Sequence, residues 1–101
     1  MIFDNAQRRH ELNPDTFEVP TMDQLRANVT TGMYVKVVGG PDPNNLERFW
    51  VLVTALPDDD WVRGDCANNL LSGMKIGEGL TFRLENICDY YQPDQEAKGG
   101  L

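Results

Sequence analysis

The sequence contains few cysteines and histidines, and this scarcity excludes several kinds of site. It has two cysteines, Cys66 and Cys88, and a single histidine, His10. The cysteines do not form a CxxC pair, and a structural zinc site needs about four nitrogen or sulfur ligands. We therefore expect no metal and no cofactor. The spacing of the two thiols leaves open whether they meet in the fold, and in a cytosol we expect both to be reduced.

Long hydrophobic runs are also missing. The apolar runs, such as residues 49–53, are far shorter than the roughly 20 residues that a membrane span needs. Residues 1–7 contain no apolar core of a secretory signal. We therefore expect no contact with a membrane and a cytoplasmic location.

Basic residues are scarce compared with acidic ones. Nine lysines and arginines stand against 16 aspartates and glutamates, for a net charge of −7, and Arg8-Arg9 is the only basic pair. Repulsion from phosphates disfavours direct binding to nucleic acid. A protein with a basic surface is the better electrostatic match, although acidity also serves solubility alone.

The sequence does contain a series of short β-type segments. Its 101 residues suit one domain. We expect an N-terminal arm or short helix over residues 1–10, one β-rich domain over 11–91 and a flexible tail over 92–101. The β-type segments are 33–38, 47–56, 61–66, 80–84 and 85–91, with a shorter extended stretch at 16–19. This spacing predicts a mainly-β fold, either a small SH3-like barrel or a strongly bent antiparallel sheet of about four or five strands with an N-terminal helix.

Alternation within these segments predicts the core. In segment 47–56, Phe49, Val51 and Val53 fall on one face, and Trp50 and Leu52 fall on the other. Two apolar faces indicate either a strand that is covered on both sides or an outer face that meets a partner. The residues that we expect in the core are Phe49, Val51, Val53, Phe82 and Ile87.

A short helix is predicted after Pro20. Thr21 and Gln24 fit a capping box, in which the side chain of each residue bonds the backbone of the other. Leu25 and Val29 then recur at helical spacing.

Several strings of this sequence occur together in a known order: NPDTFEVP (13–20), GMYVKV (32–37), ERFWVLVT (47–54), IGE (76–78) and NICDY (86–90). This order resembles a group of small bacterial and phage proteins known as domains of unknown function, over residues 11–91. A more distant link leads to proposed toxin-immunity proteins. Residues 64–69 depart from the Asp-Asn pair that follows the third strand in that group. The resemblance supports the fold and implies no activity. A phage-encoded member would act in the host cytoplasm.

The most informative feature is an acidic run that leads into an aromatic residue. Asp58, Asp59 and Asp60 precede Trp61 at the tip of a predicted hairpin. Such a surface can steer a basic partner and anchor it, because Trp and Tyr are enriched at interface hot spots. Alternatively, the aspartates solvate a turn and Trp61 packs inward. The partner-binding residues that we expect are Asp58, Asp59, Asp60 and Trp61, with help from Trp50 and Tyr91.

These observations predict a non-enzymatic, acidic protein-interaction module. One such module would be a phage or mobile-element inhibitor that occupies a basic surface of host defence or nucleic-acid machinery. The alternatives are a toxin-immunity protein, or a small-ligand-binding or enzyme domain that uses Asp65 and Asp89. We assign no catalytic residue, because no nucleophile with its base and no metal-ligand set can be assembled. The sequence leaves the oligomeric state open.

Overall fold

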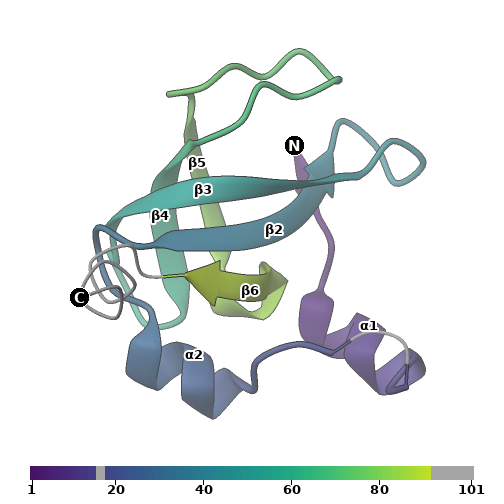
Figure 1. Ribbon diagram of the computed structural model, residues 1–101, viewed down its shortest axis with the longest axis vertical. Helices are drawn as coiled ribbons and strands as arrows, with labels where there is room; N and C mark the ends of the chain where they lie inside the picture. Colours follow the sequence, from purple (N-terminus) through teal and green to yellow (C-terminus); the bar gives the residue numbers. More distant parts are fainter. Residues whose placement is uncertain (16–17, 92–101) are drawn as a thin grey trace, which may run out of the picture.

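The chain folds into one antiparallel, barrel-like sheet with short helices at one end (Figure 1). The computed structural model describes residues 1–15 and 18–91. Of the extended stretch expected at 16–19, residues 18 and 19 belong to a connection rather than a strand, and residues 16 and 17 lie outside the described residues. The tail expected at 92–101 also lies outside them.

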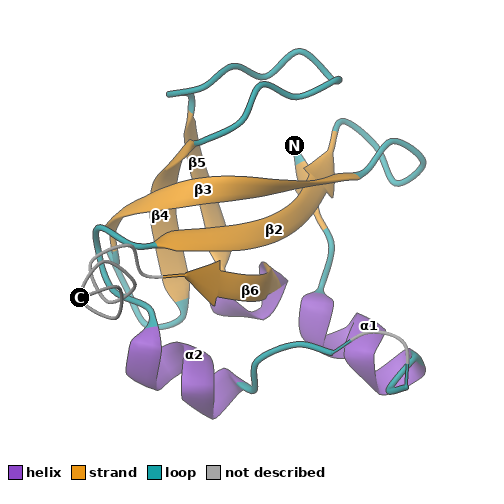
Figure 2. Cartoon of the chain, in the orientation of Figure 1, coloured by secondary structure: helices purple, strands orange, loops and turns teal. Residues whose placement is uncertain are grey.

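Six strands and three helical segments make up the described fold (Figure 2). In chain order they are β1 (Ile2–Phe3), α1 (Ala6–Leu12), α2 (Met22–Asn28), β2 (Tyr34–Gly40), β3 (Glu47–Ala55), β4 (Trp61–Cys66), β5 (Gly79–Arg83), the 3-10 helix η1 (Leu84–Asn86) and β6 (Ile87–Tyr91). The predicted mainly-β class and the bent antiparallel sheet are confirmed. The sheet has six strands, more than expected, and two α-helices accompany it.

The strand order closes the sheet almost into a barrel. Strands β1 to β5 follow one another in the order β1-β2-β3-β4-β5, and β6 also pairs with β2. Strand β2 therefore has β3 on one side, and β6 and β1 on the other, with Tyr34 opposite Tyr91 and Ile2 opposite Gly40. The ring of Phe3 in β1 lies 5.4 Å from the ring of Phe82 in β5. This contact joins the two ends of the sheet.

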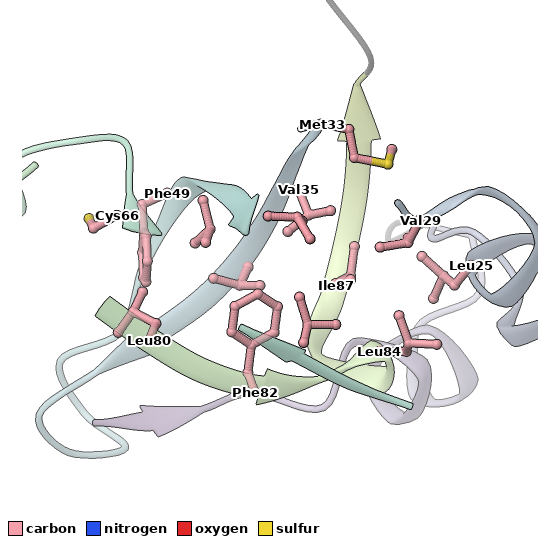
Figure 3. Close-up of a cluster of buried hydrophobic side chains, with 14 of the residues drawn as sticks. Leu25, Val29, Met33, Val35, Phe49, Cys66, Leu80, Phe82, Leu84 and Ile87 are labelled. Atoms are coloured by element: carbon pink, nitrogen blue, oxygen red, sulfur yellow. The ribbon is translucent and has the colours of Figure 1, made fainter. Parts of the chain in front are cut away.

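A single hydrophobic core fills the inside of the sheet (Figure 3). All five predicted core residues are buried, which confirms the inward faces of β3, β5 and β6. Leu25 of α2 and Val29, which follows the helix, join this core and lie beside Leu84 (Figure 3). The buried core residues are Leu25, Val29, Met33, Val35, Val37, Phe49, Val51, Val53, Val62, Cys66, Leu70, Leu80, Phe82, Leu84 and Ile87.

Helix α2 begins at the predicted capping box. The Gln24 backbone N–H donates to Thr21 Oγ1 at 3.1 Å, and the Thr21 N–H donates to Gln24 Oε1 at 2.9 Å. Two of the otherwise unpaired backbone N–H groups at this end are thereby satisfied.

The first twelve residues form strand β1, which pairs with β2 in the sheet, and helix α1. The Asn86 side-chain amide donates to the Asp4 carbonyl at 3.0 Å, and the Asn5 amide donates to Glu85 Oε2 at 2.7 Å. These bonds join the N-terminal segment to η1, about eighty residues later in the chain.

Candidate functional site

The turn between β3 and β4 carries the predicted acidic run and Trp61. Asp58 and Asp59 are exposed, and Asp60 is half-buried. The turn lines a surface pocket of about 570 Å³, here called the tip pocket. The residues that line it are Leu25, Arg26, Val29, Leu56, Pro57, Asp58, Asp59, Asp60, Trp61 and Leu84. Part of the pocket wall is therefore α2, and the sequence pattern does not predict that this helix lies beside the hairpin.

Asp60 is held in place from two directions. The Arg26 guanidinium of α2 donates to both carboxylate oxygens of Asp60, at 3.0 and 2.9 Å. The Leu84 backbone N–H donates to the Asp60 carbonyl at 2.8 Å. The hydrogen bond and charge of Arg26 hold the pKa of the Asp60 carboxyl below its ordinary value, and Asp60 raises that of Arg26. Asp60 therefore joins the turn to α2 and η1, while Asp58 and Asp59 present their charges to solvent.

Trp61 lies at the surface, with 38% of it exposed. The sequence left open whether Trp61 packs inward or lies at the surface, and the fold places it at the surface. The Arg83 guanidinium carbon lies 5.0 Å from the centre of the Trp61 ring, and Arg83 Nε also bonds Glu85 Oε1 at 2.7 Å. A cation thus already occupies one face of the indole.

Trp50 and Tyr91 lie on the outward face of the sheet, where Tyr34 joins them. The ring centres of Tyr34 and Tyr91 are 6.1 Å apart, and those of Trp50 and Tyr91 are 6.3 Å apart. Tyr34 was not among the expected partner-binding residues. Tyr34 and Lys36 are two residues apart in β2 and therefore point to the same face, and this spacing is the signal that could have found Tyr34.

The three rings belong to a second surface pocket, here called the aromatic pocket, with a volume of about 720 Å³. Its lining residues are Tyr34, Trp50, Ala67, Asn68, Asp89, Tyr90 and Tyr91. Asn68 fixes one wall, because its side-chain oxygen accepts the Trp50 backbone N–H at 2.7 Å. The expected partner-binding residues therefore line two pockets, one with Trp61 and one with Trp50 and Tyr91.

Two charged side chains lie at the aromatic pocket: Asp89 in its lining and Lys36 beside Trp50. The Lys36 ammonium lies 4.9 Å from the centre of a Trp50 ring. Lys36 stands opposite Trp50 on one side of β2 and opposite Asp89 on the other. The Asp89 carboxylate accepts the Tyr90 backbone N–H at 2.8 Å and is exposed.

The alternative site residues Asp65 and Asp89 are distant in the sheet. Asp65 in β4 stands opposite Leu52 of β3, whereas Asp89 in β6 stands opposite Lys36 of β2. Three inter-strand steps of about 4.8 Å each separate β4 from β6 along this path. The two carboxylates therefore do not share one pocket.

Both cysteines are free thiols. Cys66 is buried at the end of β4, and Cys88 is partly buried in β6, where desolvation raises the pKa of its thiol.

Within residues 1–15 and 18–91, no group of three or more His, Cys, Asp or Glu side chains is placed to hold a metal ion. In the same part of the chain, no helix has the length and apolar character to cross a membrane.

A comparison of the chain with protein-family models, with curated proteins and with solved structures finds no match. The tip pocket and the aromatic pocket are therefore the features from which a function is inferred.

Proposed function

We propose that this protein is a non-enzymatic interaction module that binds a protein with a basic surface. The observation that carries the proposal is the gathering of Tyr34, Trp50 and Tyr91 on the outward face of the sheet, within ring distances of 6.1 and 6.3 Å. Aromatic side chains of this kind supply most of the binding energy in many interfaces. Their position on three paired strands keeps them in a fixed arrangement, so little order is lost on binding.

Charge supports a basic partner. The chain carries a net charge of −7, and Asp58 and Asp59 are exposed at the β3–β4 turn. Exposed charges mainly raise the association rate and make it sensitive to salt. In this proposal the aromatic pocket holds the partner, and the turn attracts it.

The biological role of such a module depends on the identity of the protein that it binds. A phage or mobile-element inhibitor would occupy a basic surface of host defence or nucleic-acid machinery, whereas an immunity protein would occupy a toxin. The resemblance to small bacterial and phage proteins implies no activity, so it does not distinguish these two roles. Both require the same acidic and aromatic surface.

The test is cross-linked capture from a bacterial lysate, with the wild-type protein compared with Tyr91→Leu and with Leu71→Ser. Tyr91 lines the aromatic pocket, while Leu71 is almost fully exposed in the β4–β5 loop and lines neither pocket. We expect a basic protein that wild type and Leu71→Ser capture and Tyr91→Leu loses. Equal capture by all three folded proteins, or partners without a basic surface, would contradict the proposal.

A further inference from the structure

We propose that the aromatic pocket binds the guanidinium group of an arginine side chain on the partner protein. This inference rests on the proposed function and names the chemical group that the partner must present. It concerns the pocket formed by β2, β3 and β6 together with the residues that follow β4.

A cation of this chain already lies against one of the rings that line the pocket. The Lys36 ammonium lies 4.9 Å from the centre of a Trp50 ring, within the distance at which an aromatic face attracts a positive charge. The Tyr34 and Tyr91 rings stack at an interplanar angle of 29° beside it. An arginine from a partner would meet the same negative ring faces, and Lys36 would have to move away from Trp50 to admit it.

A carboxylate completes the site. Asp89 lines the pocket, and the Tyr90 N–H bond uses only one of the roughly four positions at which a carboxylate accepts hydrogen bonds. Asp89 also lines the neighbouring pocket together with Glu18, so a second acidic side chain lies nearby. A guanidinium that stacks on a ring can therefore donate to Asp89 at its edge.

The geometry favours arginine over lysine. Guanidinium is planar, stacks on aromatic faces and is more weakly hydrated than ammonium, so its removal from water costs less. The volume of about 720 Å³ leaves room for a whole side chain at the surface. Nucleic acid bases also stack on aromatic rings. Their phosphates, however, would face Asp89 and a chain with a net charge of −7.

The experiment follows the fluorescence of Trp50 during peptide titration. In a Trp61→Phe background Trp50 is the only tryptophan. The probes are a peptide of alternating glycine and arginine, the same peptide with lysine, and single-stranded oligothymidylate. We expect the arginine peptide to change the Trp50 emission and to bind at least about threefold more tightly than the lysine peptide. Oligothymidylate is expected to leave the emission unchanged.

Matched variants separate a site from general charge attraction. Lys36→Met removes the internal cation and keeps the aliphatic chain, and it should raise the affinity for the arginine peptide more than Lys75→Met does. Lys75 lies in the exposed β4–β5 loop, and its substitution changes the net charge equally. Asp89→Asn should weaken binding about fivefold. Asp15→Asn, at an exposed position that lines neither pocket, should change the affinity much less.

Three results would contradict the proposal that the aromatic pocket binds an arginine side chain. The first is equal affinity for the arginine and lysine peptides, together with equal changes in affinity for the two Lys→Met variants and for the two Asp→Asn variants. That pattern would show that binding depends on net charge alone. Absence of peptide binding at low salt is another. Oligothymidylate binding that Asp89→Asn strengthens would assign the face to nucleic acid. None of these three results decides the proposed function, which is tested separately by the capture of a basic protein. Conversely, pocket-dependent peptide binding without any captured basic protein would overturn the proposed function.

Discussion

The Arg26 guanidinium donates two hydrogen bonds to the Asp60 carboxylate, a residue 34 positions later in the chain. This pair connects α2 with the β3–β4 turn. Asp60 also has a φ of 61°, in the left-handed region that few residues other than glycine adopt. Asp and Asn tolerate this conformation better than most side chains. The acidic run thus contains one aspartate with a structural role and two that remain at the surface.

Asp60→Asn should destabilise the protein near neutral pH while keeping the backbone of the turn. Pairing lowers the pKa of Asp60 in the folded state. Its stabilising effect is therefore fully present above the unfolded value near 3.8, and is lost as the pH falls through the lower folded value. Denaturant unfolding at a series of pH values should show the gap between wild type and variant closing in acid. Asp59→Asn removes the same charge from the same turn and should produce a smaller gap. A gap that widens in acid would contradict the pairing.

Phe82→Ala should lower the free energy of unfolding by about 3–5 kcal/mol, the usual cost of removing a buried aromatic ring. Phe82 is 2% exposed and also contacts the Phe3 ring, so the variant loses both core packing and closure of the sheet. The measurement is the denaturant midpoint at constant slope. Ile76→Ala, at a position that is 63% exposed, is the control and should stay within about 0.5 kcal/mol of wild type. An unchanged midpoint for Phe82→Ala would show that this face is not inward.

Gly64→Ala should destabilise the sheet strongly. A Cβ atom at Gly64 would lie 2.4 Å from the Leu52 carbonyl oxygen and 2.5 Å from a Val51 methyl carbon, so β3 and β4 would have to separate. We expect a loss of about 1–3 kcal/mol or more, as for other overpacked sites. Gly79→Ala is the matched control, because nothing lies within 4 Å of its Cβ position. Thermal unfolding of both variants tests the difference, and equal stabilities would contradict the close approach of the strands.

Cys88 should react slowly with an alkylating reagent. Burial disfavours the charged thiolate and raises the pKa of this thiol, although the charges of Lys36 and Arg48 act in the opposite direction. A Cys66→Ala variant leaves Cys88 as the only thiol. Its alkylation rate with iodoacetamide at mildly alkaline pH should be lower than that of a small unstructured peptide with one cysteine, and should rise in denaturant. A rate above that of the peptide would contradict the pKa shift.

Features that depend on residues close together in the chain could be predicted from the sequence alone. Alternation placed Phe49, Val51 and Val53 on the inward face, because successive side chains of a strand point to opposite sides of a sheet. The Thr21 and Gln24 capping box lies within a single helical turn, so its spacing alone predicts it.

Which of these faces meet depends on how the strands and helices pack together. Tyr34 joins Trp50 and Tyr91 only because β2 pairs with both β3 and β6, a pairing that joins segments far apart in the chain. The partner of Asp60 is likewise set by the docking of α2 on the sheet. Local periodicity states which side chains share a face of one strand, but strand order depends on the packing of the whole core. For that reason the inward residues could be predicted from the sequence, and the aromatic pocket could not.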